Sequence, residues 1–355
     1  MLKSFLSRGC HRVVSGVGAL ALMAFLALPV AAQTGRVVIV QTNSAGDSVM
    51  LIDPTTDTIV GEIPDAEAIH GAAISPDGRH LYLTNESLDT VDVVDTATLR
   101  ITNRIPLTGR PNNLAIRKDG QRLYVAIREV DGGVDVVDTV AEERVRSIRV
   151  LGGVHNTFIT PDGKYVVAGS TGGSVATVID TETERPAWSI HFEGGVRPIC
   201  FETNPDGSTK RMFVQITNLH GFAIVDWEQR KEVGRITLPD VPPAERNNEG
   251  IQGAPAHGLL IAPDRKTLWS TSKFNSHVYV YSIPDLEYLG AVRVGTVPDW
   301  LTFTPDSKKV YVANAHSNTV TVIDVAARRP IKTLEVGPVP KRNITAIIPA
   351  LPSTQ

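Results

Sequence analysis

The chain has 355 residues, a formal net charge of −3 at pH 7, 42% hydrophobic residues and two cysteines. This length can bury a large core, and no linker or second compositional zone divides the chain, so we expect one large domain. The weakly acidic balance excludes no enzyme class but disfavours nucleic-acid binding, because proteins that follow the phosphate backbone usually carry a basic stripe.

Residues 1–32 differ from the rest and are predicted to be a signal peptide, followed by a mature domain of residues 33–355. Three basic residues and no acidic residue precede an apolar run that ends in small residues, the arrangement that a signal peptidase recognises. Cleavage before Gln33 predicts a periplasmic or secreted protein without stable membrane insertion. A retained anchor is the alternative, because residues 13–32 are long enough to span a bilayer.

A repeated unit organises the mature chain, and its clearest copy covers residues 300–337. Four short runs rich in apolar and β-branched residues alternate with turn residues, which predicts four antiparallel strands. The first turn reads Pro305-Asp306-Ser307, where other copies have Pro-Asp-Gly. A sheet of this size cannot bury its faces alone, so the unit is predicted to be one blade of a propeller.

Two sets of markers repeat with nearly the same period. A residue at the end of the third strand recurs at Asp53, Asp95, Asp138, Asp180, Asp226, Ser282 and Asp324. An aspartate in the first turn recurs at Asp77, Asp119, Asp162, Asp206, Asp264 and Asp306. Each set has one enlarged interval, Asp226 to Ser282 in the first and Asp206 to Asp264 in the second, which places an insertion between Asp226 and Asp264. The first set predicts seven copies.

The copies carry a family resemblance. Tyr82-Leu83-Thr84-Asn85 and Val310-Tyr311-Val312-Ala313-Asn314, each followed by a β-branched strand that ends in aspartate, resemble the YVTN-repeat β-propellers of bacteria and archaea. The resemblance covers roughly Arg36 to Pro349. It implies a seven-bladed β-propeller, in a group that includes surface-layer, cell-envelope and binding proteins and propellers that accompany redox enzymes.

The fold class that follows is all-β, with seven four-stranded antiparallel blades. The first copy begins at Val37 without an inner strand, and the chain ends with an unpartnered strand at 343–348. We therefore expect the C-terminal strand to complete the N-terminal blade, which removes the open sheet edges. The mature chain keeps only Cys200, which is predicted to be a buried hydrophobic residue without a disulfide.

One position near the start of each inner strand is polar in every copy. Counting back from the first-turn aspartate, the predicted ring consists of His70, Asn112, His155, Arg197, His257, Asp299 and Asn343. These side chains are expected to meet at one mouth of the central channel. His70, His155 and His257 can bind a divalent metal ion there, with Asp299 as a carboxylate ligand or proton carrier. The alternatives are non-metal ligand binding and an ordinary polar channel lining.

Other polar residues are expected around the same mouth. Glu86, Arg128, Lys273 and His316 follow second strands, and Trp300 can offer a stacking surface. Together they predict a funnel that holds a small charged or hydroxylated molecule, although each residue alone is typical of a solvated loop. An insertion of about fourteen residues before His257 is rich in Pro, Gly and Asn and contains Glu249, a candidate base or metal ligand. It is either a binding loop or a tolerated surface insertion.

Two interpretations of function remain. In the first, the protein is an exported propeller that binds a small molecule, a cofactor, or an envelope or redox protein partner in its funnel. In the second, it is a metal-dependent enzyme, such as a lyase, lactone hydrolase or oxidase, whose histidines bind the ion while Glu249 or Asp299 transfers protons. Nothing in the sequence names the substrate.

Overall fold

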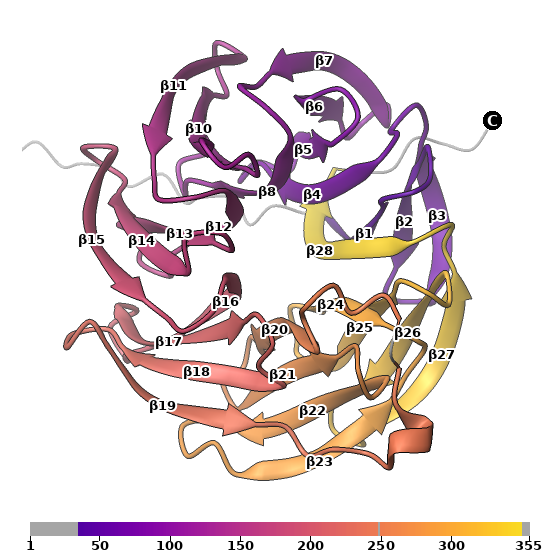
Figure 1. The fold of residues 1–355 in the computed structure, drawn as a ribbon. Helices are drawn as coiled ribbons and strands as arrows, with labels where there is room; N and C mark the ends of the chain where they lie inside the picture. Colours follow the sequence, from indigo (N-terminus) through magenta and orange to yellow (C-terminus); the bar gives the residue numbers. More distant parts are fainter. Residues whose placement is uncertain (1–34, 248, 350–355) are drawn as a thin grey trace, which may run out of the picture. The chain divides into compact units, whose positions relative to one another are not determined.

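The structure is a computed structural model and describes residues 35–247 and 249–349. The predicted signal peptide, residues 1–32, lies outside the described residues. The strands form seven four-stranded antiparallel sheets, which confirms the predicted fold class. Figure 1 shows the sheets arranged around a central axis, with one strand of each sheet innermost. Within the described ranges, no helix has the length and apolar character needed to cross a membrane.

The blades follow the chain in order. Blade 1 contains β28 (Pro340–Ile348), β1 (Arg36–Asn43), β2 (Val49–Asp53) and β3 (Thr58–Ile63). Blade 2 contains β4 (Ile69–Ile74), β5 (His80–Asn85), β6 (Thr90–Asp95) and β7 (Arg100–Pro106). Blade 3 contains β8 (Pro111–Ile116), β9 (Arg122–Ile127), β10 (Gly133–Asp138) and β11 (Glu143–Arg149). Blade 4 contains β12 (Val154–Ile159), β13 (Tyr165–Ser170), β14 (Val175–Asp180) and β15 (Arg185–His191).

The second half repeats the pattern after one long connection. Blade 5 contains β16 (Val196–Thr203), β17 (Thr209–Ile216), β18 (Gly221–Asp226) and β19 (Lys231–Thr237). The insertion follows, with a short 3-10 helix, η1 (Pro243–Glu245). Blade 6 contains β20 (Ala256–Ile261), β21 (Thr267–Ser272), β22 (His277–Ser282) and β23 (Tyr288–Arg293). Blade 7 contains β24 (Pro298–Phe303), β25 (Lys309–Asn314), β26 (Thr319–Asp324) and β27 (Arg329–Glu335).

The aspartates that mark the repeat have a structural cause, because each set caps a turn. Asp77 Oδ1 accepts hydrogen bonds from the Ser75 hydroxyl at 2.6 Å and the Arg79 amide at 3.1 Å. At the end of a third strand, Asp95 Oδ1 accepts from the amides of Ala97 and Thr98 at 2.9 and 2.8 Å. Both are the local turns that aspartate favours, so these residues recur with every blade.

The core lies between the blades. In the described part of the chain, each of the seven buried apolar clusters joins two neighbouring sheets. Ile39 and Ile52 of blade 1, for example, pack with Tyr311 of blade 7. Cys200 is free and 5% exposed in the cluster between blades 5 and 6, as the sequence predicted. Because every blade buries both faces, the sheets hold the inner strands rigidly around the axis.

The ring closes as predicted. β28 from the C-terminus pairs antiparallel with β1 from the N-terminus, with Val40 opposite Ile344 and Gln41 opposite Asn343. Figure 1 shows β28 in the innermost place of blade 1, beside β4 and β24. This arrangement leaves blade 1 with four strands from two distant parts of the chain.

Candidate functional site

A polar cavity of about 460 Å³ lies where the inner strands begin. Its wall comes from the first residues of inner strands, the turns between second and third strands, and the connections between blades. The lining includes five cationic side chains and one carboxylate: Arg110, Arg128, Arg197, Lys273, Lys341 and Glu86. The carboxylate of Asp299 is buried behind this wall, where it forms ion pairs with Lys273 and Lys341. The site therefore carries a surplus of three positive charges, although the whole chain is negative.

Five residues of the predicted ring line this cavity, namely His70, Asn112, His155, Arg197 and His257. Asp299 occupies the corresponding position on β24 and is 1% exposed. The structure thus brings these six equivalent positions together, five in the cavity lining and Asp299 against His257. Glu86, Arg128 and Lys273 also line the cavity, as expected from their positions after second strands.

The seventh ring position belongs to Lys341 and not to Asn343. In blade 7, Pro298 lies opposite Asn314, the last residue of β25, and Asp299 follows it. In blade 1, Pro340 lies opposite Asn43, the last residue of β1, and Lys341 follows it. The C-terminal segment has no first-turn aspartate from which to count back, and β28 has nine residues where β24 has six, so the predicted position was two residues out.

Asn343 lies deeper and is fully buried. Its amide nitrogen donates to Gln41 Oε1 at 3.1 Å and to the Tyr311 carbonyl at 3.2 Å. It joins blades 1 and 7 and does not line the cavity. The structure therefore gives Asn343 a place in the packing between two blades.

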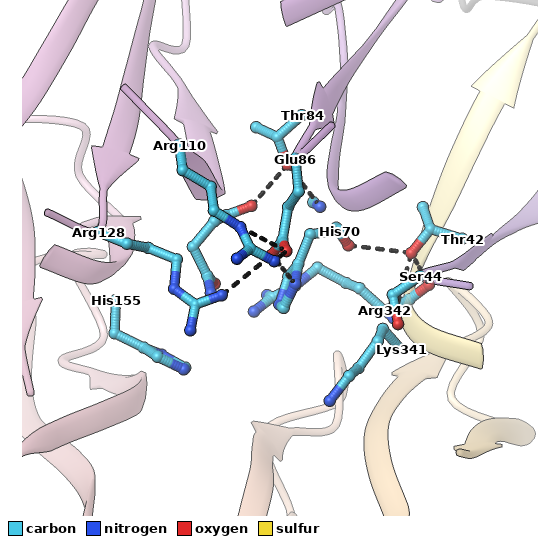
Figure 2. A network of polar contacts seen from close by, with 12 residues as sticks. Thr42, Ser44, His70, Thr84, Glu86, Arg110, Arg128, His155, Lys341 and Arg342 are labelled. Atoms are coloured by element: carbon cyan, nitrogen blue, oxygen red, sulfur yellow. Dashed lines mark hydrogen bonds and ion pairs between the residues drawn. The ribbon is translucent and has the colours of Figure 1, made fainter. Parts of the chain in front are cut away.

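Glu86 organises one side of the cavity. His70 Nδ1 lies 2.7 Å from Glu86 Oε1, and Arg110 and Arg128 both form ion pairs with the same carboxylate. Figure 2 shows the two guanidinium groups and His70 converging on Glu86. Burial opposes ionisation of Glu86, yet the hydrogen bonds from His70 and Arg110 and the charge of Arg128 lower its pKa to about 2. This carboxylate is ionised at neutral pH.

Asp299 organises the other side. His257 Nδ1 and Lys273 Nζ lie 2.8 and 2.9 Å from Oδ1, and Lys341 Nζ lies 2.7 Å from Oδ2. Burial opposes ionisation, but the charges of both lysines and the contact with His257 hold the pKa of Asp299 well below its usual range. Burial also lowers the pKa of Lys273 to about 8, against the pull of Asp299.

The three predicted histidines are neutral at pH 7. Burial lowers the pKa of His257 to about 3 and moves the pKa of His70 and His155 below the usual value as well. The rings of His155 and His257 meet edge to face, with centroids 5.8 Å apart. Among the described residues, His155 contacts no carboxylate and faces the Asn156 amide, whereas the other two histidines each face one carboxylate. A neutral imidazole whose Nδ1 faces a carboxylate can accept a hydrogen bond from a ligand at Nε2.

The ring does not suit a metal ion in this arrangement. The described residues contain no group of three or more His, Cys, Asp or Glu side chains placed to hold one ion. Glu86 and Asp299 are each already in contact with two cationic side chains. A divalent cation would enter a cavity that carries surplus positive charge, which opposes its binding.

The insertion forms part of the cavity wall through Gln252. The Gln252 carbonyl accepts a 2.8 Å hydrogen bond from Arg197 Nη2, while Arg197 Nε donates to Thr217 Oγ1 at 3.1 Å. Asn247 connects the same loop to blade 6, because its amide donates to the Phe274 carbonyl at 2.7 Å. The loop is therefore more than a surface insertion, since it positions a cation of the cavity.

Two other predicted residues lie outside the cavity. Glu249 is exposed in the insertion, and His316 is exposed next to Gly250 of the same loop. Neither lines the cavity. The predicted base Glu249 is thus not brought to the ring in this structure.

Trp300 belongs to the floor beneath the ring. It is 6% exposed and stacks on Phe158 across the axis, with centroids 6.2 Å apart and planes inclined by 14°. The guanidinium of Arg342 lies 3.7 Å from the centroid of Trp300 and donates to Asn156 Oδ1 at 2.9 Å. These aromatic and cationic groups close the axis below the cavity, so the stacking surface predicted for a ligand is covered by protein.

Sequence reasoning missed Arg110, Lys341 and Gln252. Arg110 stands immediately before Pro111, in a connection that the repeat assigns to the functional face, so its charge was a usable signal. Lys341 was hidden by the two-residue error at the C-terminus. Gln252 could not be placed, because an insertion has no counterpart in the other blades.

Asn112 has no hydrogen-bond partner within the described protein. Its side chain is 1% exposed, it lines the cavity, and neither its oxygen nor its nitrogen is bonded. Buried amides are nearly always satisfied. A ligand or an ordered water that both donates and accepts is therefore expected beside Asn112.

Comparison with known proteins finds similarity to a hydrazine synthase subunit and to propeller structures named as lactonases. Hydrazine synthase subunit beta of Kuenenia stuttgartiensis is 29% identical over an alignment of 231 residues, and the match covers 54% of this chain and 59% of that protein. The match thus spans less than two thirds of the relative's length. The solved hydrazine synthase structure of the same organism is 25% identical, has a TM-score of 0.70 and aligns over 81% of this chain and 92% of its own.

Two further structures share the fold. A periplasmic gluconolactonase of Pseudomonas aeruginosa is 18% identical, with a TM-score of 0.71 over 88% of this chain and 100% of its own. A putative 6-phosphogluconolactonase of Bacteroides fragilis is 17% identical, with a TM-score of 0.71 over 89% of this chain and 99% of its own. The family described as "Lactonase, 7-bladed beta-propeller" matches residues 149–334, slightly more than half of the chain. The protein therefore belongs to this family of seven-bladed β-propellers.

Proposed function

We propose that the cavity binds a small molecule that carries carboxylate or phosphate groups. The observation that supports this proposal is the cation surplus, because five cationic side chains face one lining carboxylate. Charge-assisted hydrogen bonds from arginine and lysine are the usual means of holding such groups. The volume of about 460 Å³ suits a small ligand and is within the range of ligand pockets.

Calorimetric titration tests this proposal. Gluconate and 6-phosphogluconate serve as anionic probes, and sorbitol serves as a neutral probe of similar size. We expect the two anions to bind and sorbitol not to bind, with affinities that fall as salt is added because the charges are partly screened. Arg197→Met should weaken binding of the anions, whereas Arg100→Met, on an exposed position of the outer strand β7, should not. Equal binding of sorbitol and gluconate would refute the proposal.

The second candidate function is hydrolysis of a lactone, and the contact between His257 and Asp299 favours it. A neutral imidazole whose Nδ1 faces a carboxylate can use its other nitrogen as a general base. In this proposal, His257 takes a proton from the water that attacks the lactone carbonyl, and the cationic wall stabilises the developing oxyanion. When this intermediate collapses, the ring C–O bond breaks and His257 returns the proton to the leaving ring oxygen, so that the ring opens to the hydroxy acid. Asp299 then orients His257 and does not itself transfer protons, because it is held ionised.

Proton release distinguishes hydrolysis from binding. Opening of an ester ring produces an acid, so titration at constant pH measures turnover of gluconolactone above its spontaneous hydrolysis. His257→Gln should remove the enzymatic part, while gluconate still binds because the cationic side chains of the cavity remain. If the wild-type protein produces no acid beyond the spontaneous rate, binding alone remains. Elemental analysis of the same preparation tests the second interpretation of the sequence, a metal-dependent enzyme.

The finer predictions on export and partners are also proposals. Residues 1–32 are proposed to direct export, and the Pseudomonas aeruginosa gluconolactonase is by name periplasmic. A protein partner is the other occupant suggested for the funnel face, since the relative from Kuenenia stuttgartiensis is a subunit. The YVTN assignment depends on the repeat residues alone. N-terminal sequencing of protein from the periplasmic fraction, with Gln33 as the expected first residue, tests export.

A further inference from the structure

The cavity contains two clusters of the same chemical composition. On one side Glu86 is held by His70, Arg110 and Arg128, and on the other Asp299 is held by His257, Lys273 and Lys341. Each cluster thus consists of one carboxylate, one histidine and two cations. The first comes from blades 2 and 3, and the second from blades 6, 7 and 1, and Figure 1 shows β4 and β8 across the axis from β20 and β24.

Each cluster has one positive charge in excess. The carboxylate balances one of its two cations, and the histidine adds no charge because it is neutral at pH 7. The excess charge is on the cavity side, since Arg110, Arg128, Lys273 and Lys341 all line the cavity. A ligand with one acidic group at each cluster would balance both excess charges. A ligand with a single acidic group would leave the excess charge of one cluster unbalanced.

The histidines add a second requirement. His70 and His257 both direct Nδ1 to a carboxylate, which favours the proton on that nitrogen and leaves Nε2 as an acceptor. An acceptor next to a cation suits a hydroxyl group next to an acid group. Asn112 lines the same cavity with an unbonded donor and an unbonded acceptor, and hydroxyl groups satisfy both.

We infer that the ligand is a hydroxylated diacid that spans the cavity, with one acidic group at the Glu86 cluster and the other at the Asp299 cluster. This inference rests on the proposed binding of anions. It adds the number of acidic groups, their separation across the axis, and the hydroxyl groups between them. Arg197, on blade 5 between the clusters, donates hydrogen bonds to Thr217 and Gln252 and contributes positive potential to the middle of the ligand.

Four six-carbon probes separate these requirements by calorimetry. Galactarate has two acid groups and hydroxyls, gluconate has one acid group and hydroxyls, adipate has two acid groups alone, and galactitol has hydroxyls alone. We expect galactarate to bind at least about tenfold more tightly than gluconate or adipate, which is the minimum for one lost charge-assisted contact. Galactitol should not bind.

Variants assign each acid group to its cluster. Arg128→Met and Lys341→Met should each reduce the affinity for galactarate to about that for gluconate, and the double variant should lose binding of both. Arg128→Lys and Lys341→Arg keep the charge and should retain most of the affinity. Arg100→Met is the control for removal of a cation elsewhere, and thermal unfolding verifies that every variant is folded.

The outcomes distinguish this inference from the proposed function. If gluconate binds as tightly as galactarate, or if both single variants weaken the two acids equally, the diacid inference is wrong and anion binding stands. If adipate equals galactarate, the hydroxyl requirement is wrong. If none of the acids binds to the folded wild-type protein, the inference and the proposed function fail together.

Discussion

The backbone amide of Arg342 donates a 3.2 Å hydrogen bond to the hydroxyl oxygen of Thr42, which lies 300 residues earlier in the chain. Blades 2 and 6 contain the same contact within a single segment, where the amides of Gly71 and Gly258 donate to Thr84 and Thr271 at 2.7 Å. The closing blade thus reproduces the geometry of an ordinary blade. Its stability depends on both ends of the domain.

Removal of the closing strand should unfold the protein. Deletion of residues 339–355 takes away β28 and leaves the inner edge of β1, with the buried Val38 and Val40, exposed to solvent. We expect insoluble expression or loss of cooperative thermal unfolding. Deletion of residues 350–355, which lie beyond β28, is the matched control. An unchanged melting temperature in the longer deletion would contradict the closure.

Acid should destabilise the fold through His257. Burial lowers its pKa from 6.5 to about 3, so the unfolded chain binds a proton at a higher pH than the native protein does. The free energy of unfolding is therefore highest above pH 6.5 and decreases toward pH 3, by up to about 1.4 kcal/mol per pH unit for this residue. Denaturant titrations between pH 6 and 4.5 measure the slope. His257→Gln should reduce it, and His316→Gln, which removes an exposed histidine, is the control.

Alkali should weaken the binding of anions through Lys273. Its pKa is lowered to about 8, so the ammonium group loses its charge as the pH rises through that value. We expect the affinity for gluconate to be highest below pH 8 and to decrease above it. Lys273→Arg should abolish the decrease between pH 7 and 9, because the guanidinium group stays charged. A wild-type affinity that is constant over this range would contradict a role for Lys273 in binding.

The floor beneath the cavity should depend on Trp300. Its ring packs against both Phe158 and the guanidinium of Arg342, and the side chain is 6% exposed. Trp300→Ala should lower the free energy of unfolding by about 3–5 kcal/mol, as expected for loss of a large buried aromatic. Trp300→Phe should cost less, since it retains stacking. Chemical denaturation of both variants tests the difference, and a small effect of the alanine change would indicate that the floor is not packed as described.

The insertion should be sensitive to substitution at Gly250. This residue has φ +71°, and an added Cβ would lie 2.3 Å from the ring of His316. The exposed His316 ring can turn away, but the positive φ of Gly250 strains an alanine, so Gly250→Ala should shift the loop and weaken gluconate binding through Gln252 and Arg197. Gly207→Ala is the matched control, because Gly207 has a φ of +86° with no atom within 4 Å of an added Cβ. The strain from the positive φ is common to both, but only Gly250 lies in the loop that contributes Gln252 to the cavity, so a difference in gluconate affinity reports the path of that loop. Equal affinities would show that the loop does not set the cavity wall.

The sequence by itself determined the blade count, the strand order within a blade and the closure by the C-terminal strand. These features are repeated locally, since each copy contains its own turn aspartates and alternating apolar residues. It also located six of the seven ring residues, because a shared position in a repeat becomes a shared position around the axis.

The tertiary structure decided the features that have no repeated counterpart. The register of β28 assigned the last ring position to Lys341, because strand length there is set by pairing with β1 and not by a following turn. The path of the insertion brought Gln252 to the cavity and left Glu249 in solvent. The partners of Glu86 and Asp299 come from neighbouring blades, and such contacts depend on side-chain reach and burial across the axis, which periodicity along the chain does not encode.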